Sequence, residues 1–175
     1  VMMAGRVEPH KNQLGLIRAL RDSDVEVVIV GPPHPHHPGY YRQCEAEAGA
    51  NVRMLGGVPH EELPRLYRQA RVHALPTFYE TTGLVSLEAA LSGCSIVTTS
   101  RGHAREYLGD HAWYCDPDDL ESIRRAVRAA LEAPASRDLA DLIRSRYTWA
   151  HTARATYGAY QTVIDRRRGL NRRDQ

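Results

Sequence analysis

Short apolar segments alternate with longer amphipathic segments along most of this chain, which narrows its fold class more than any other feature. Runs of β-branched and apolar residues predict strands, whereas apolar residues three and four apart predict helices. The predicted strands span residues 1–4, 25–30, 52–55, 72–75, 95–99 and 112–115. The predicted helices span residues 12–21, 40–48, 60–70, 84–92, about 120–131, 138–146 and 151–166. This order indicates right-handed βαβ units and a parallel sheet covered on both faces, the Rossmann-like doubly wound α/β class.

Prolines and charges set the expected limits of these elements. The prolines from Pro32 to Pro38 predict irregular structure as far as Gly39. Pro64 is expected in the first turn of its helix, where a missing N–H has little consequence. Residues 167–175 end the chain in a basic run that predicts a frayed, solvated tail. The 175 residues are expected to form one domain, 1–175.

The composition excludes several classes of protein. With 42% hydrophobic and 25% charged residues, the chain is typical of a globular domain, and it has no apolar run long enough to cross a bilayer. The 23 basic and 21 acidic residues are too balanced to predict nucleic acid as a partner, and peripheral contact with a membrane stays open. Three cysteines without a C-x-x-C motif favour a reducing compartment, so we expect a cytoplasmic protein.

The first candidate site follows the first predicted strand, in the segment from Gly5 to Lys11. Lys11 is the only lysine among the 23 basic residues. In a doubly wound sheet, ligands bind beyond the carboxyl ends of the strands. The guanidinium of Arg6, the ammonium of Lys11 and the first N–H groups of the next helix suit a diphosphate. Two solvated surface cations are an equally good interpretation, because neither a P-loop nor a G-x-G-x-x-G motif is present.

The second candidate site contains two carboxylates separated by seven residues, Glu80 and Glu88. If the helix begins near Gly83, Glu88 lies about 7 to 8 Å along its axis. The pair could then contact two ends of one ligand, whose negative middle lies on the amides of Thr82, Gly83 and Leu84. Carboxylates accept hydrogen bonds from sugar hydroxyls, so a nucleotide sugar fits this arrangement. A lone glutamate in a short helix is more often solvated or a cap.

Taken together, these segments resemble the donor-binding C-terminal domain of retaining GT-B glycosyltransferases of group 1 or family 4. The segments that carry the resemblance are Gly5-Arg6 with Lys11, Val28-Ile29-Val30-Gly31, Leu55-Gly56-Gly57-Val58, Glu61-Glu62-Leu63 with Tyr67 and Ala70, and Pro76 through Gly93. Glu80 to Glu88 resembles the E-x7-E motif of that family. The resemblance implies a single C-terminal half of a GT-B fold, without the N-terminal acceptor domain and inactive by itself.

The resemblance also implies roles for individual residues. Arg6 and Lys11 would bind the donor diphosphate and offset charge on the leaving group, and Glu80 would contact hydroxyls of the transferred sugar. Other donor contacts are expected at Gly5, at Gly31 and Val58 near the base, at Thr82, Gly83 and Leu84, and at Glu88 on the ribose. The implied reaction retains configuration and needs no metal ion or other cofactor, because side-chain cations take the electrostatic role of a metal.

Several features leave the substrate and the function open. Thr81 and Thr82 stand where the family usually has Gly-Phe, so the transferred sugar is undefined, as is the base, whether of UDP, GDP or ADP type. His34, His36 and His37 lie between prolines, which suits a flexible loop better than a metal site. The alternative function is a non-catalytic nucleotide-binding or protein-interaction module of the same fold. The acceptor and the oligomeric state are not indicated.

Overall fold

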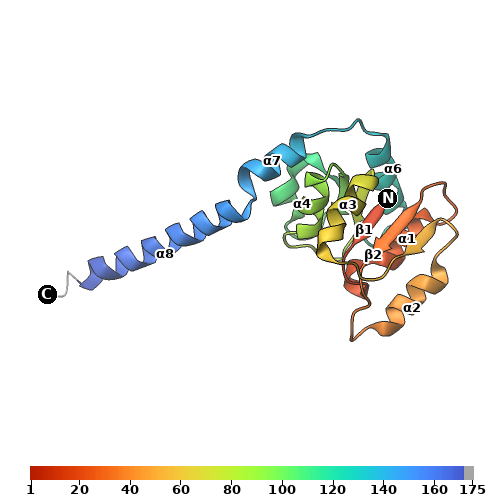
Figure 1. Cartoon of the computed structure of the whole chain (residues 1–175), viewed down its shortest axis with the longest axis horizontal. Helices are drawn as coiled ribbons and strands as arrows, with labels where there is room; N and C mark the ends of the chain where they lie inside the picture. The colour runs from red at the N-terminus through yellow and green to blue at the C-terminus, as the bar shows by residue number, and fades with distance from the viewer. Residues whose placement is uncertain (172–175) are drawn as a thin grey trace. The chain divides into compact units, whose positions relative to one another are not determined.

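The structure, a computed structural model, describes the backbone of residues 1–171 and side chains through residue 167. Its centre is a six-stranded parallel sheet in the order β3-β2-β1-β4-β5-β6 (Figure 1). The strands are β1 (Met2–Ala4), β2 (Val27–Val30), β3 (Val52–Met54), β4 (Val72–Leu75), β5 (Ser95–Thr99) and β6 (Trp113–Cys115). All six predicted strands are present, and the predicted Rossmann-like α/β class is confirmed.

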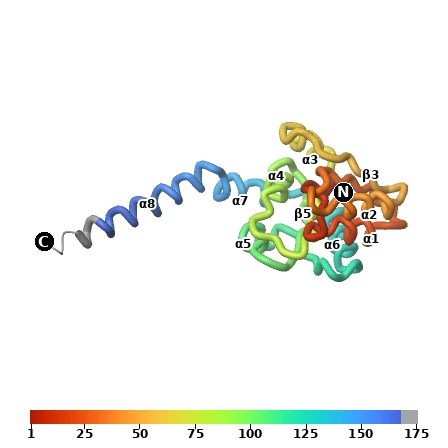
Figure 2. Tube along the Cα trace, turned by 90° about the horizontal axis from the view of Figure 1, so that it is seen from below, coloured from red at the N-terminus to blue at the C-terminus, as the bar shows by residue number. Residues whose placement is uncertain are grey.

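The central strands are apolar on both faces because helices cover both faces of the sheet. All four residues of β4 are buried, and β1 is buried over its whole length. The helices are α1 (Gln13–Leu20), α2 (Pro38–Glu47), α3 (Leu63–Gln69), α4 (Leu84–Leu91), α5 (Ala104–Leu108), α6 (Leu120–Glu132), α7 (Asp138–Arg146) and α8 (Trp149–Asn171). Helix α1 packs against α2 and α6 on one face, and α3 packs against α4 on the other, as Figure 2 shows.

Helix boundaries differ from the predictions at several places; α3, for example, begins at Leu63, after a short 3-10 helix at His60–Glu62. Helix α2 begins at Pro38, so the prediction of irregular structure as far as Gly39 is wrong; proline fits the first turn, where its missing N–H is harmless. The five-residue helix α5 was not among the predicted helices, because it is too short to show a helical period. Helix α8 runs to Asn171, into the predicted frayed tail, whose residues 172–175 lie outside the described part.

A buried histidine, His73, lies between β1 and β4 at the centre of the sheet and takes the place of part of their backbone pairing. The two strands pair at Met2 and His73. Beyond that pair, the N–H of Ala4 donates to Nε2 of His73 at 3.3 Å instead of to a strand carbonyl. The sheet order reverses between β1 and β4, so the loops that leave these strands diverge here. Ligands of doubly wound proteins bind at such a point.

His73 predicts a pH dependence of stability. Complete burial lowers the pKa of His73 from 6.5 to about 3, because desolvation disfavours the charged ring. Between pH 6.5 and about pH 3, His73 is therefore protonated in the unfolded chain and neutral in the folded chain. The free energy of unfolding should fall as the pH drops from 6.5 toward 3, by up to about 1.4 kcal/mol per pH unit for this group.

Urea unfolding of wild type and His73→Gln between pH 4 and pH 7 measures this contribution. Glutamine keeps an acceptor for the N–H of Ala4 but does not titrate, so the variant should lose less stability on acidification. His36→Gln, at an exposed position, should behave as wild type does. Parallel pH profiles for wild type and His73→Gln would contradict the prediction.

The chain divides into two compact units, Val1–Ala140 and the remainder from Asp141. The first unit contains the whole sheet and helices α1 to α6. The second contains α8, whose side chains Trp149, Tyr157 and Tyr160 are exposed. All candidate site residues belong to the first unit, and the single domain 1–175 stays a prediction.

Candidate active site

The loops after β1 and β4 bring Lys11 and Glu80 together, 69 residues apart in sequence. The ammonium Nζ of Lys11 donates to Oε2 of Glu80 at 3.1 Å. The side chain of Lys11 is 22% exposed and that of Glu80 is 8% exposed, so the pair lies at the edge of the core and faces solvent on one side. The structure therefore brings these two side chains into contact at the carboxyl edge of the sheet.

The first turn of helix α4 opens beside this pair. Gly83 is the N-cap of α4, and no side chain caps the turn. The first N–H groups of a helix have no intrahelical acceptor and carry partial positive charge. The N–H of Thr81 donates to Oε1 of Glu80 at 3.2 Å, which fixes the second carboxylate oxygen. The turn therefore places backbone donors and a carboxylate side by side.

A hollow of about 310 Å³ lies over this turn. The residues that line it are Lys11, Glu80, Thr81, Thr82, Gly83, Leu84 and Val85. It combines an ammonium with the positive end of a helix, which attracts an anion, and a carboxylate that accepts hydrogen bonds from hydroxyls. A ligand that carries both a phosphate and a polyol part matches these groups.

Arg6 lies in the same loop as Lys11 but does not line the hollow. Its guanidinium, 61% exposed, lies 3.8 Å from Oε1 of Glu8. Oε2 of Glu8 lies 3.5 Å from Nε2 of His34, on the loop after β2. The backbone is fixed, since Nε2 of Gln13 donates to the carbonyl of Arg6 at 2.9 Å. The guanidinium of Arg6 therefore lies near Glu8 and does not line the hollow together with Lys11.

Glu88 also lies outside the lining of the hollow, in the second turn of α4. Its Oε1 lies 3.4 Å from Nε2 of His60, which precedes α3. Burial, together with the charge of Glu88, raises the pKa of Tyr67. The Tyr67 hydroxyl is buried without a hydrogen-bond partner among the described residues. Glu88 therefore contacts His60 and does not line the hollow together with Lys11 and Glu80.

The loops expected near a base lie side by side. The N–H of Gly31, after β2, donates to the carbonyl of Gly56, after β3, at 2.7 Å. The N–H of Gly5 donates to the carbonyl of Val30 at 2.9 Å, so the loop after β1 joins this group. Val58 is half-buried on the loop after β3. All these loops leave the carboxyl ends of their strands.

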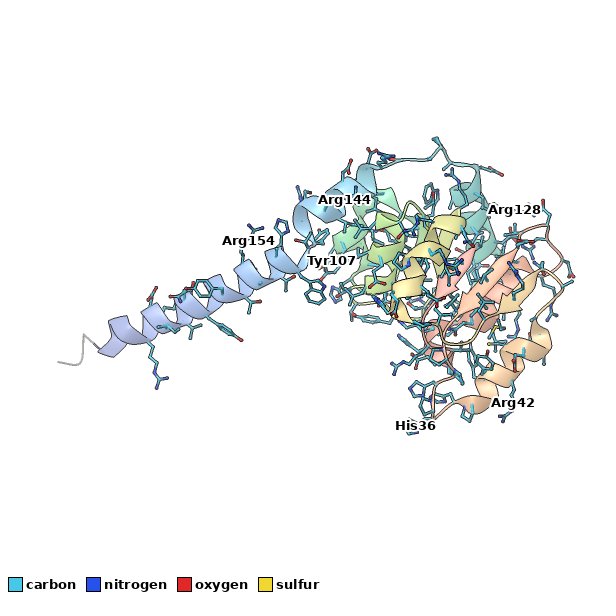
Figure 3. All side chains as sticks on the ribbon, viewed as in Figure 1. His36, Arg42, Tyr107, Arg128, Arg144 and Arg154 are labelled. Atoms are coloured by element: carbon cyan, nitrogen blue, oxygen red, sulfur yellow. The ribbon has the colours of Figure 1, made fainter. Side chains whose placement is uncertain are left out.

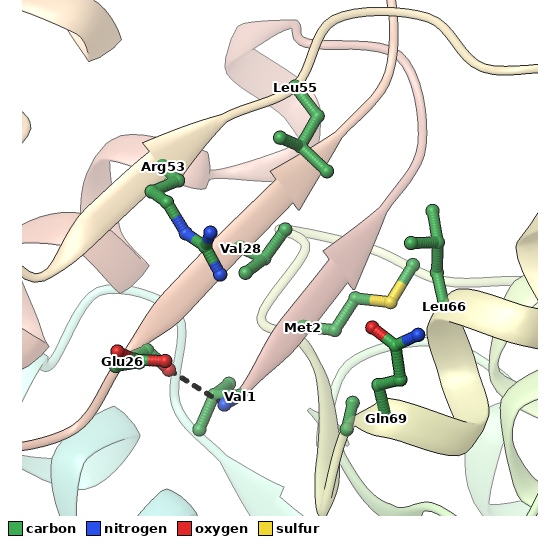
Figure 4. A pocket seen from close by; sticks show the side chains of 9 residues that line it. Val1, Met2, Glu26, Val28, Arg53, Leu55, Leu66 and Gln69 are labelled. Atoms are coloured by element: carbon green, nitrogen blue, oxygen red, sulfur yellow. Dashed lines mark hydrogen bonds between the residues drawn. The ribbon is translucent and has the colours of Figure 1, made fainter.

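A larger hollow of about 370 Å³ lies elsewhere, beside the first residues of β1 and β2 (Figure 4). The residues that line it are Val1, Met2, Glu26, Val28, Arg53, Leu55, Leu66, Gln69 and Ala70. Most of its lining belongs to the first residues of β1 and β2 and to α3, and of these residues only Leu55 follows the carboxyl end of a strand, the edge at which doubly wound proteins bind ligands. Volume alone therefore does not identify the site.

Metal-ligating side chains do not gather in the part of the chain that the structure describes. His36 lies in the loop before α2, the helix that carries Arg42 (Figure 3). The ring of His34 packs at 5.2 Å from that of His37, and its Nε2 pairs with Glu8. Within residues 1–171, no helix is both long and apolar enough to span a membrane.

Comparison with known proteins decides the family. The sequence profile described as "Glycosyl transferases group 1" matches residues 1–147. The chain belongs to the glycosyl transferases of group 1. The predicted resemblance to the group 1 glycosyltransferases is therefore confirmed.

Relatives of this group 1 chain include a mannosyltransferase and a glycosyltransferase. It is 31% identical to the O-antigen chain mannosyltransferase B of Escherichia coli over 173 residues, 91% of this chain and 45% of the relative. It is 30% identical to the D-inositol 3-phosphate glycosyltransferase of a Nocardioides species over 187 residues, 92% of this chain and 41% of the relative. The chain spans less than half the length of these relatives.

Solved structures of low sequence identity share the fold. Anabaena HepE in complex with UDP and glucose superposes with a TM-score of 0.82 at 18% identity, over 92% of this chain and 48% of that one. The C-terminal domain of the group 1 family protein LpcC from Francisella tularensis superposes with a TM-score of 0.73 at 18% identity, over 85% and 86% of the two chains. The second match corresponds to a single domain.

Three contributors to the site were not predicted from the sequence. Asn12, next to Lys11, donates to the carbonyl of Pro76, His60 contacts Glu88, and the carbonyl of Arg101 accepts from the N–H of Glu80. For Asn12 a signal was present, since asparagine before a helix is a preferred N-cap. No local pattern marks the contacts of His60 or Arg101, because their partners are distant in sequence.

Proposed function

We propose that this chain is the donor-binding half of a retaining glycosyltransferase, the C-terminal half of a GT-B fold that uses a nucleoside-diphosphate sugar. The observation that carries the proposal is the contact of Lys11 with Glu80 at the uncapped N-terminus of α4. The helix end and Lys11 bind the diphosphate, with Arg6 turning toward it from the same loop. The match to a C-terminal domain of the same family supports the position of this half.

The proposed transfer needs charge stabilisation at the leaving group. The bond from the anomeric carbon to the diphosphate breaks, and its electron pair stays on the diphosphate. The acceptor hydroxyl bonds to the same carbon and gives its proton to the departing diphosphate. The ammonium of Lys11 and the N–H groups of α4 offset the charge that develops on the diphosphate, so no metal is required. The acceptor binds to a separate N-terminal domain, and this half by itself is inactive.

Titration calorimetry of the chain with UDP, GDP and ADP tests the proposal. We expect one of them to bind with a dissociation constant between about 1 μM and 1 mM. The structure of HepE with UDP makes UDP the first ligand to try. Absence of binding by all three would favour a protein-interaction module of the same fold.

The two glutamates should respond differently to ligand. Glu88→Gln should weaken binding of the nucleoside diphosphate itself by about tenfold, because a carboxylate on the ribose hydroxyls is lost. Glu80→Gln should weaken the nucleotide sugar by a similar factor but leave the nucleoside diphosphate almost unchanged, since Glu80 contacts the sugar. Calorimetry with both ligands measures each effect.

Glu62→Gln, at an exposed position ahead of α3, is the control and should change neither affinity. Equal losses for both ligands in Glu80→Gln and Glu88→Gln would contradict the assigned order of sugar and ribose.

A further inference from the structure

Asn12 connects the loop of Lys11 to two other loops at the carboxyl edge of the sheet. Its Nδ2 donates to the carbonyl of Pro76 at 3.1 Å and to that of Pro117 at 2.9 Å. Its Oδ1 accepts from the N–H of Gly15 at 3.1 Å and caps α1. Asn12 is 6% exposed, so all three polar contacts are protected from water. The backbone next to Lys11 is therefore held to the loops after β4 and β6.

Glu80 is held from the other side by the loop after β5. Its N–H donates to the carbonyl of Arg101 at 3.2 Å, and its carbonyl accepts from the N–H of His103 at 2.8 Å. Gly102 lies between them with φ +94°, and a Cβ there would lie 2.1 Å from the carbonyl oxygen of Glu80. The backbone of Glu80 thus follows the loop after β5 closely.

Both sets of contacts, the first from Asn12 and the second from Glu80 through Arg101, lead to residues 116–118 after β6, which we call the β6 loop. We call each set an arm: the Asn12 arm leads to Lys11 and the Arg101 arm leads to Glu80. The guanidinium of Arg101 donates to Oδ1 of Asp116 and to Oδ2 of Asp118, each at 2.7 Å. The N–H of Asp118 donates to Oδ1 of Asp116 at 3.1 Å, which stiffens the loop. Pro117, whose carbonyl accepts from Asn12, is buried between them.

These contacts form a continuous ring. Lys11 is followed in sequence by Asn12, which contacts the β6 loop, and the β6 loop contacts Arg101, which contacts Glu80. The Lys11–Glu80 contact of 3.1 Å closes it. Neither Asn12 nor Arg101 lines the hollow over α4, so neither is placed to touch a ligand there. A lysine has a flexible stem, and its ammonium is placed accurately only where its backbone is fixed.

We propose that Asn12 and Arg101 are positioning residues, which use the β6 loop as a common anchor to set the separation of Lys11 and Glu80. This inference rests on the proposed function of that pair. Arg101 acts through the backbone of Glu80, and Asn12 acts through the backbone of Lys11. The β6 loop thereby determines how a nucleotide sugar is held without contacting it.

Arg101→Ala is the variant that tests the arm to Glu80. Its ion pairs are exposed, so their loss should hardly change the urea midpoint of unfolding. We expect a nucleotide sugar to bind about tenfold more weakly, because the carboxylate of Glu80 is no longer held in place. Both bonds come from Nη2 of Arg101, so Arg101→Lys, whose ammonium also donates from a single nitrogen, should restore part of the affinity.

A double-mutant cycle with Glu80→Gln separates positioning from a general structural effect. If Arg101 acts through Glu80, Arg101→Ala should weaken binding in the wild-type background and have little effect in the Glu80→Gln background. Arg105→Ala, which removes another exposed ion-paired arginine, is the matched control and should leave the affinity unchanged. A loss of the same size in both backgrounds, or no loss from Arg101→Ala, would overturn the role of Arg101.

Asn12→Gly tests the second arm, because glycine keeps the φ of +61° and removes only the amide. We expect it to weaken a nucleoside diphosphate, the ligand part assigned to Lys11, by about tenfold, and to have little effect in a Lys11→Ala background. If Asn12→Gly, compared at the same folded fraction, binds the nucleoside diphosphate as tightly as wild type, the positioning role of Asn12 is contradicted. If the wild-type protein binds no nucleotide, the proposed function fails as well. If the wild type binds and both Arg101→Ala and Asn12→Gly bind with the same affinity, only the positioning role is contradicted.

Discussion

Lys11→Ala should weaken binding of a nucleoside diphosphate by about 1.5 to 3 kcal/mol, roughly 10- to 150-fold. Among the residues that the structure describes, Lys11 is the one side-chain cation that lines the hollow over α4. Its removal deletes a charged hydrogen bond to the diphosphate. It also leaves the carboxylate of Glu80, 8% exposed, without its ammonium partner and facing an anionic ligand.

Arg18→Ala is the matched control for Lys11→Ala. Arg18 is an ion-paired cation on α1, the helix that follows Lys11, and it makes two contacts of 2.6 Å with Glu47. Its loss should leave nucleotide affinity unchanged. The double variant Lys11→Ala with Glu80→Gln should recover part of the affinity, because it removes the unpaired carboxylate. Equal affinities for Lys11→Ala and Arg18→Ala, measured by titration calorimetry, would contradict the assignment of Lys11 to the diphosphate.

The fold was predictable because its strands are short, apolar and buried on both faces. β4, with all four residues buried, interrupts the helical period so clearly that its bounds agree with the prediction. The helix boundaries that the sequence did not predict depend on details of single residues and short segments. Pro38 starts α2 where a proline was taken to delay it, and α5 has too few residues to show a period.

The candidate site was predictable only in part, and the reason is sequence distance. Lys11 and Glu80 could be expected to meet, since in a parallel sheet the segments after β1 and β4 leave the same edge. No comparable rule predicts the contacts that hold these two residues in place. The amide of Asn12 bonds to a carbonyl 105 residues away, and only the folded chain brings the two together. The pairing of Arg6 with Glu8 likewise depends on how one loop bends.

Gly31 illustrates a residue whose predicted role and structural role differ in kind. The sequence predicts that its loop lies near a base. In the structure, Gly31 has φ +155°, and a Cβ there would lie 1.9 Å from the carbonyl oxygen of Gly5. Its N–H also donates to Gly56 at 2.7 Å. Gly31 is therefore packed between the loops after β1 and β3, with no room for a side chain.

Gly31→Ala should lower the free energy of unfolding by about 3 kcal/mol, because both the backbone strain and the contact with Gly5 must be relieved by moving main chain. Urea unfolding measures the change. Gly39→Ala is the control: in the first turn of α2, its Cβ would meet only the flexible end of Arg42 at 3.9 Å. That variant should be as stable as wild type or slightly more stable.

A Gly31→Ala protein that unfolds at the wild-type urea concentration would contradict this packing. Its nucleotide affinity, measured where the protein is still folded, carries a second consequence. The carbonyl that the new Cβ displaces belongs to Gly5, directly before Arg6, so relief of the contact moves the start of the loop that leads to Lys11. Weaker binding should therefore accompany lower stability in Gly31→Ala, whereas Gly39→Ala changes neither, which connects the packing of the strand ends to the placement of the cation.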